Sequence, residues 1–277
     1  MGWRRPVIRV VAVDWSGALI GAERKIWLAE AGNRGVARLE CGRSREEVAA
    51  HLIDMAGADG ELIAGMDFAF SMPAWWLDRQ GIRDAPVLWR WLGDGHAERL
   101  LASCEAPFWG RRGTRKPRDC ALLRATDRAT IAGGGAAPKS VFQIAGAGAV
   151  GTASLRGMPL LADLRDAGFA IWPFDPPRLP MAIEIWPRTC TGPVVKTNAA
   201  ARRERAIAHA DRMTAAMIDA CTASDDAFDA CMSALAMWDH RDDLGALPAI
   251  GDPLLRREGI IWHPGWRAAH ANAARCA

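Results

Sequence analysis

The chain has 277 residues, with 35 lysine and arginine side chains against 32 aspartate and glutamate side chains, a formal net charge of +3. Half of the residues are hydrophobic and 24% are charged, the balance of a globular protein that can bury a full core. This composition excludes the disordered, collagen-like and coiled-coil classes. At roughly 150 residues per domain, the length fits one large domain or two small ones.

The sequence offers no membrane span and no disulfide framework. No apolar run reaches the ~18 residues that a transmembrane helix needs. Arg4 and Arg5 precede an apolar run as in an export signal, but Asp14 interrupts that run before it is long enough. The 7 cysteines are scattered without a C-x-x-C pair, which argues against disulfide scaffolds and zinc ribbons. We expect a cytoplasmic protein with no membrane partner.

The first 73 residues carry the clearest secondary-structure pattern. A β-branched run over 7–17 predicts a buried strand, and residues 24–30 and 35–41 predict two short strands joined by a Gly-Asn-Arg-Gly turn. Ser44, followed by Glu46 and Glu47, predicts the capped start of a helix. Residues 61–70 predict a second buried strand. A helix that connects two strands of one sheet implies parallel pairing with a right-handed crossover.

The middle of the chain is less regular than its ends. Residues 74–180 predict a large, mainly helical insertion, with helices over 121–131 and 158–168 and a strand-like piece over 169–174. After it, residues 181–186 predict a strand and 199–221 one long helix, and Ser224 caps a helix that runs to about Trp238. Residues 259–264 predict a final short strand. We therefore expect a single α/β domain over 1–277, with a core (1–73 and 181–264) interrupted by the insertion.

Several carboxylates lie in segments that we predict to be part of the core, where they are not needed for solubility. Asp14 ends the first predicted strand, Asp67 lies within the second buried strand, and Glu184 is flanked by isoleucines in a third. Asp226 and Asp229 are three residues apart and so share one helix face. Buried carboxylates are costly unless they are paired, hydrogen-bonded or bound to metal. Acids from neighbouring strands suggest oxygen ligands for Mg²⁺ or Mn²⁺.

Each of these acids has a plainer explanation when it is taken alone, as an arginine partner or a turn cap. Their number and order favour a metal site, in which two ions would stabilise the attacking and leaving oxygens of a displacement at phosphorus. We expect Asp14 and Asp229 to be the main metal ligands and Asp67 to complete the second site. Asp226 is the reserve ligand, and Glu184 would hold or activate water.

Two basic features are candidates for phosphate binding. Residues 111–118 (RRGTRKPR) hold five basic side chains in eight, and arginine forks suit phosphates. Arg118 is the member of this stretch that we single out, and Lys196, after the strand that bears Glu184, is a second candidate. The stretch could bind a nucleic acid backbone or a phosphorylated small molecule, or it could be a solvated surface loop.

The order of predicted elements and acids resembles a known superfamily. Three strands, a helix, a fourth strand, an interruption, a fifth strand and a terminal helix are the order of the ribonuclease H-like fold, whose acids lie on the first strand, the strand after the first helix and a late helix. Asp14, Asp67 and the Asp226/Asp229 pair match these positions, and the pair looks like the Holliday-junction resolvase branch. The resemblance implies a mixed five-stranded sheet flanked by helices.

A closer resemblance is to the family called domain of unknown function 429, which is proposed to contain ribonuclease H-like nucleases. The matching pieces are VAVDWSG (11–17), IAGMDFAFSMP (63–73), RDC (118–120), IEIWP (183–187), DDAFDACMSALA (225–236) and EGIIWHP (258–264). They cover both ends of the chain and little of the insertion. The resemblance implies a nuclease that depends on Mg²⁺ or Mn²⁺.

Two other functions remain open from the sequence. Actin-like ATPases and sugar kinases share this sheet, and their first hairpin cradles phosphate after an aspartate. The run from Asp14 to Gly17, with the Ser16 hydroxyl, could do the same. Those proteins need two duplicated halves, and this chain shows one. A non-catalytic binding module of the same fold is the third possibility.

Overall fold

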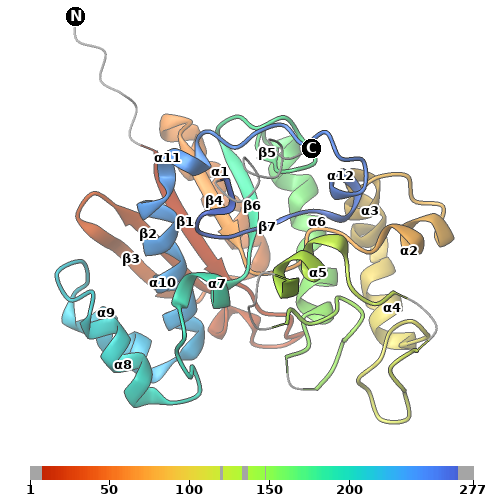
Figure 1. The fold of residues 1–277 in the computed structure, drawn as a ribbon, viewed down its shortest axis with the longest axis horizontal. Coiled ribbons are helices and arrows are strands. Elements are labelled where there is room, and N and C mark those ends of the chain that lie inside the picture. The colour runs from red at the N-terminus through yellow and green to blue at the C-terminus, as the bar shows by residue number, and fades with distance from the viewer. Residues whose placement is uncertain (1–7, 119–120, 133–136, 147, 268–277) are drawn as a thin grey trace, which may run out of the picture.

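The computed structural model describes residues 8–118, 121–132, 137–146 and 148–267 (Figure 1). It is an α/β fold built on a mixed seven-stranded sheet of order β3-β2-β1-β4-β6-β5, in which β7 also pairs with β6. The strands are β1 (Arg9–Asp14), β2 (Trp27–Gly32), β3 (Gly35–Cys41), β4 (Leu62–Met66), β5 (Ala170–Ile171), β6 (Met181–Ile185) and β7 (Ile261–Trp262).

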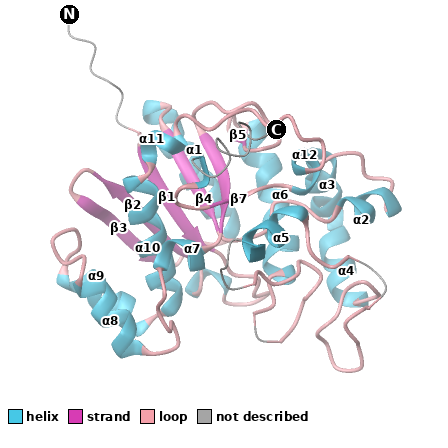
Figure 2. Ribbon diagram, viewed as in Figure 1, coloured by secondary structure: helices cyan, strands magenta, loops and turns pink. Residues whose placement is uncertain are grey.

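Helices surround this sheet, and those of the 74–180 segment cover somewhat less than half of that segment (Figure 2). They are α1 (Arg45–Asp59), α2 (Ala74–Arg79), α3 (Ala85–Trp91), α4 (Ala97–Ser103), α5 (Ala125–Ala132), α6 (Gly151–Asp166), α7 (Pro187–Thr191), α8 (Ala199–Ile207), α9 (Ala215–Ala223), α10 (Asp225–Asp239), α11 (Arg241–Leu244) and α12 (Leu255–Glu258), with short turns η1 (Ala22–Arg24) and η2 (Leu92–His96). None of the helices in the described ranges is long and apolar enough to cross a membrane.

The N-terminal unit follows the sequence prediction closely. β1 pairs antiparallel with β2 and β2 with β3, while β1 and β4 are parallel, as expected for strands joined by a helix. The predicted capping box is present: the Glu47 N–H donates to Ser44 Oγ, and the Ser44 N–H donates to the Glu47 carboxylate. β4 ends at Met66, earlier than predicted, and beyond Asp67 the chain turns toward α6, where the Ala69 N–H donates to Ser154 Oγ.

The two faces of the sheet are covered by different helices. Successive residues of a strand point to opposite faces, and the hydrophobic clusters divide accordingly. Val11 and Val13 pack with α1 and with the helices of the 74–180 segment. Val10 and Ala12 pack instead with α10, which crosses the other face (Figure 1). Gly65 lets α10 approach closely, because a Cβ at this position would lie 2.5 Å from Met237 Sδ.

The 74–180 segment shares its core with β1 and β4. Trp76, Trp89 and Phe142 are fully buried in the same hydrophobic cluster as Val11 and Val13. The prediction of a five-stranded sheet is wrong, because two-residue strands β5 and β7 both pair in parallel with β6. Both strands lie within the pieces that we predicted to be strand-like, 169–174 and 259–264, but the expected five-stranded sheet did not include both of them.

The prediction of one helix over 199–221 is also wrong. The chain forms α8 and α9 with a break between them, and Thr214 caps α9 by accepting the Met217 N–H. At the break, the Arg212 carbonyl accepts the Val36 N–H at 2.8 Å, and the backbone of Gly35 (φ +97°) lies against Arg212. Contact with the β2–β3 hairpin, which lies far away in the sequence, therefore outweighs local helix propensity.

Candidate functional site

Asp14 and Asp67 lie side by side at the carboxyl ends of two parallel strands. The register of β1 and β4 pairs Val13 with Met66, and the Asp67 N–H continues the ladder by donating to the Val13 carbonyl at 3.0 Å. By alternation, both aspartates point to the face that α10 covers. Asp14 is 8% exposed and Asp67 is half-buried. The sequence prediction that these two acids are neighbours is therefore matched by the geometry.

The third acid comes from α10. Ser224 caps this helix by accepting the Ala227 N–H at 3.1 Å, which sets where its first turns lie on the sheet. Asp229 is 4% exposed, and its charge acts on both Asp14 and Asp67. Asp226 lies one turn earlier and is partly exposed. We call Asp14, Asp67 and Asp229 the acidic cluster.

Lys196 provides the only side-chain cation that pairs with the acidic cluster among the described residues. Its ammonium makes an ion pair and a hydrogen bond with Asp229 Oδ2. The other oxygen of that carboxylate, Oδ1, is buried and has no hydrogen-bond partner. The carboxylates of Asp14 and Asp67 make no hydrogen bond or ion pair with any described side chain. The acidic cluster is thus short of both positive charge and hydrogen-bond donors.

The pKa values of the cluster follow from this shortage. Burial raises the pKa of Asp67 to about 8, with a further contribution from Asp229. Burial likewise raises the pKa of Asp229 to about 6, although Lys196 opposes the shift. Burial and the charge of Asp67 raise the pKa of Asp14 well above its usual range. Burial alone would lower the pKa of Lys196, but the charge of Asp229 outweighs it and raises that pKa.

Glu184 is not part of the acidic cluster. It lies in β6 between Ile183 and Ile185, which pack on the α10 face, so its own side chain points to the opposite face. There its carboxylate accepts two hydrogen bonds from Arg124, at 2.5 and 2.8 Å, and one from the Phe70 N–H at 3.0 Å. These three donors hold the Glu184 carboxylate in place, and its charge still acts on Asp67. Its role in holding or activating water stays a prediction.

Arg124 is the centre of this second group, and the sequence did not reveal it. The guanidinium is 2% exposed and also donates to Asp127 Oδ1 at 2.9 Å and to the Glu258 carbonyl at 3.2 Å. Burial acts to lower the pKa of Arg124, but Asp127 and Glu184 outweigh it and raise that pKa. The spacing of Arg124 and Asp127, three residues apart at a helix start, was the available signal. We call Arg124, Asp127 and Glu184 the arginine cluster.

The residues predicted to bind phosphate differ in exposure and in position: Ser16 is buried near Asp14, whereas Arg118 is exposed. Ser16 is 9% exposed, follows β1 within two residues of Asp14, and accepts the Ala18 N–H on its hydroxyl. Arg45 holds this turn by donating to the Ser16 carbonyl at 2.8 Å. Arg118 is exposed and lines an open surface hollow with Arg115 and Lys116. Asp119 and Cys120, which complete the RDC motif, lie outside the described residues.

Cys190 on α7 is a neighbour of the acidic cluster that the sequence did not single out. Burial raises the pKa of its thiol to about 12, and the charges of Asp67 and Asp229 act in the same direction. A thiol with this pKa stays protonated and unreactive at neutral pH. Cys190 therefore contributes to the wall of the site rather than to its chemistry.

The described residues do not contain a ready-made set of metal ligands. Within the described ranges, no three or more histidine, cysteine, aspartate or glutamate side chains are grouped so that they could hold a metal ion as they stand.

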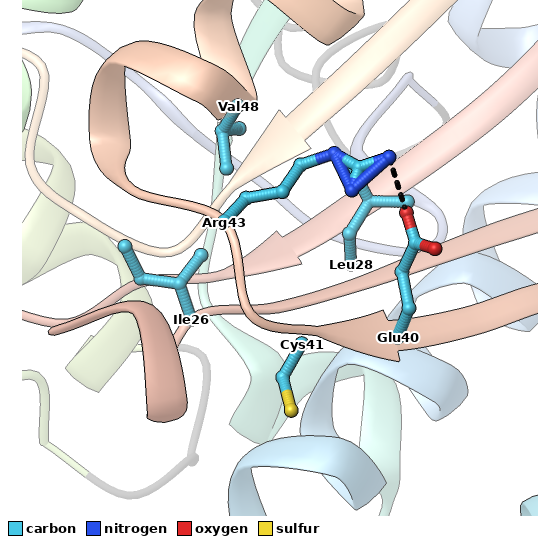
Figure 3. A pocket seen from close by; sticks show the side chains of 6 residues that line it. All are labelled: Ile26, Leu28, Glu40, Cys41, Arg43 and Val48. Atoms are coloured by element: carbon cyan, nitrogen blue, oxygen red, sulfur yellow. Dashed lines mark ion pairs between the residues drawn. The ribbon is translucent and has the colours of Figure 1, made fainter. Parts of the chain in front are cut away.

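A separate apolar pocket lies between β2, β3 and the start of α1. It is lined by Ile26, Leu28, Val48 and Cys41 and edged by the Arg43–Glu40 ion pair at 3.0 Å (Figure 3). None of the predicted site residues lines this pocket.

No protein family, curated protein or solved structure matches this chain. The functional argument therefore depends on the arrangement of its own residues.

Proposed function

We propose that this protein is a ribonuclease H-like phosphodiester hydrolase that depends on Mg²⁺ or Mn²⁺, related to the domain of unknown function 429 family. The observation that carries the proposal is the unpartnered, buried Oδ1 of Asp229 beside the carboxyl groups of Asp14 and Asp67, which have no ion-pair partner among the described side chains. A structural role gives no reason to keep such an arrangement, because buried charges without partners destabilise a fold.

The donor chemistry of the acidic cluster fits a hard divalent cation. Its donors are carboxylate oxygens, which Mg²⁺ and Mn²⁺ prefer. A bound divalent cation would favour the ionised forms of Asp14, Asp67 and Asp229, which burial disfavours in its absence. As they stand, the described acids do not form a complete set of metal ligands, and Lys196 holds one oxygen of Asp229. Asp229 Oδ2 becomes available once Lys196 moves away.

In the proposed site, Asp14 and Asp229 are the main ligands, Asp67 completes the set and Asp226 is the reserve ligand at its exposed edge. A bound divalent ion would supply stabilisation of the attacking and leaving oxygens at phosphorus. Glu184 has a positioning role: it accepts the Phe70 N–H three residues after Asp67, so the Arg124–Glu184 ion pair fixes the segment that follows Asp67.

The proposed substrate is a nucleic acid, with the exposed basic residues of the 111–118 loop as its backbone contacts. Arg115, Lys116 and Arg118 gather around one surface hollow, a grouping that suits consecutive phosphates. A small phosphodiester would need fewer of these contacts. Comparison of the two substrate sizes therefore tests the role of the loop.

The test is cleavage of single-stranded and double-stranded DNA and RNA and of bis-p-nitrophenyl phosphate, with Mn²⁺ or with a chelator. We expect Mn²⁺-dependent cleavage that Asp14→Asn and Asp229→Asn each reduce by at least about a hundredfold, since loss of a ligand exceeds the effect of an outer-sphere partner. Asp225→Asn is the matched control, because Asp225 lies in the first turn of the same helix but is exposed. Cleavage that persists in both site variants contradicts the proposal.

A further inference from the structure

We propose that the Lys196 ammonium is a built-in counter-ion that occupies the divalent-cation position of the acidic cluster and leaves when the cation binds. This inference rests on the proposed function. It assigns Lys196 a role that differs from phosphate binding, which the sequence predicted.

Only one of the two carboxylate oxygens of Asp229 has a hydrogen-bond partner. Lys196 Nζ binds Oδ2, and Oδ1 of the same carboxylate is buried without a partner. A carboxylate that binds a lysine through one oxygen while the other is unsatisfied is a poor permanent ion pair, because a buried carboxylate is stable only when both oxygens have partners. The pair is therefore a resting arrangement.

The second step is the charge balance. Among the described residues, Lys196 makes the one ion pair with the acidic cluster, through Asp229, and its charge also acts on Asp14 and Asp67. One ammonium opposes the repulsion among the three carboxyl groups without removing it. A divalent ion bound to the same carboxyl groups would lie close to the ammonium. Like charges at such a separation repel strongly in a partly buried site, so the ammonium and the divalent ion compete.

The third step is that Lys196 can leave without disturbing the fold. Its carbonyl is held by the Arg202 guanidinium, which also donates to the Cys221 carbonyl at 3.0 Å, so the backbone is anchored. The side chain is 31% exposed, and the neighbouring Val195 is 65% exposed. A lysine on a flexible four-carbon stem can swing its ammonium into water from such a position.

The displaced ammonium would also be free for the first time to bind a phosphate. In the resting arrangement it is engaged with Asp229. The predicted phosphate-binding role of Lys196 is therefore possible only after displacement, and metal binding comes first.

The experiment is a Mn²⁺ titration of the full chain by calorimetry, together with thermal unfolding in chelator and in Mn²⁺. Lys196→Met removes the charge and keeps the length of the side chain, and Lys196→Arg keeps the charge. Lys25→Met is the matched control, since Lys25 acts on Asp226 but is exposed. We expect Lys196→Met to bind Mn²⁺ at least about tenfold more tightly than wild type, with Lys196→Arg and Lys25→Met within about threefold.

Thermal unfolding provides the second measurement. In chelator, Lys196→Met should unfold at a lower temperature than wild type because its acids have lost their counter-ion, and Mn²⁺ should raise its Tm by more than it raises that of wild type. If wild type binds Mn²⁺ and Lys196→Met binds it equally or more weakly, the counter-ion role is wrong while the proposed function stands. If neither protein binds Mn²⁺, the metal-dependent function is wrong as well.

Discussion

The two faces of the sheet carry two buried charged clusters with opposite properties. In the arginine cluster, both oxygens of Glu184 accept hydrogen bonds from Arg124, and Asp127 accepts further bonds from the same guanidinium. In the acidic cluster, three carboxylates share one lysine, and Asp229 Oδ1 has no hydrogen-bond partner. Both clusters are built at the carboxyl ends of neighbouring strands, so location does not explain the difference.

A structural charge cluster and a candidate ligand site differ in whether their hydrogen-bond donors and acceptors are matched. A buried ion pair whose donors and acceptors are matched holds segments together, as Arg124 joins α5, β6 and the Glu258 carbonyl. A cluster with unmatched acids raises the free energy of the folded state unless something binds there. The same conservative substitution should therefore have opposite effects on the two faces.

The largest expected effect is on the arginine cluster. Arg124→Met should lower the free energy of unfolding by about 3–5 kcal/mol, because it leaves two buried carboxylates without their partner. Denaturation in urea measures the loss. Arg128→Met is the control, since Arg128 lies on α5, which begins directly after Arg124, but is exposed. A loss below about 1 kcal/mol in Arg124→Met would show that the arginine cluster is not a structural anchor.

A paired substitution compares the two faces directly. In chelator at pH 8, Asp67→Asn should stabilise the protein by roughly 1–3 kcal/mol, because it removes a charge that burial and Asp229 disfavour. Glu184→Gln should destabilise it by a similar amount, because Arg124 loses its charged acceptor. Both changes replace a carboxylate by its amide. Equal signs for the two variants would remove the distinction between the clusters.

The pH dependence of stability is the next effect in size. The pKa of Asp67 rises to about 8 and that of Asp229 to about 6 in the folded protein, against about 4 in an unfolded chain. The folded state therefore holds more protons, and stability in chelator should fall as pH rises from 4 to 8, by up to about 1.4 kcal/mol per pH unit and group.

Comparison of wild type with Asp67→Asn isolates this contribution from that of other titrating groups. The free energy of unfolding of Asp67→Asn minus that of wild type should increase from pH 5 to pH 8. Added Mn²⁺ should make this difference smaller by stabilising wild type. A difference that stays constant with pH would mean that Asp67 is ionised throughout this range.

The smallest expected effect concerns the helix that carries Asp229. Ser224→Ala should cost about 1 kcal/mol, because the Ala227 N–H loses its cap. Ser44→Ala should cost a similar amount at α1, where the capping box is. Only Ser224→Ala should also weaken Mn²⁺ binding, since α10 bears Asp229 and α1 bears no residue of the acidic cluster. Equal Mn²⁺ affinities in the two variants would argue against a role of α10 placement in the site.

Much of the acidic cluster could be predicted from the sequence because it depends on short-range patterns. A helix between two buried strands implies that the strands are parallel. From this pairing, Asp14 and Asp67 could be predicted to be neighbours. The Ser224 cap fixed the helix phase of Asp226 and Asp229. Lys196 was singled out by its position after a strand, but its ion pair with Asp229 depends on the path of the 192–198 loop, which shows no pattern.

The arginine cluster shows where prediction from the sequence ends. The run I-E-I at 183–185 shows that Glu184 points away from its neighbours, but it does not show which face α10 covers. Arg124 lies in a segment rich in exposed arginines, and only tertiary packing buries it. The α8–α9 break likewise depends on the contact between Val36 and Arg212, which are 176 positions apart in the sequence.

The most direct test of the central claim is the equilibrium binding of Mn²⁺ to wild type, Asp14→Asn, Asp229→Asn and Asp225→Asn, measured by calorimetry at pH 8, with circular dichroism to confirm that each variant folds. We expect wild type and Asp225→Asn to bind Mn²⁺ and Asp14→Asn and Asp229→Asn to lose binding, which would place both carboxylates at one site. Absence of binding to wild type at millimolar Mn²⁺, or equal binding by all four folded proteins, would contradict it.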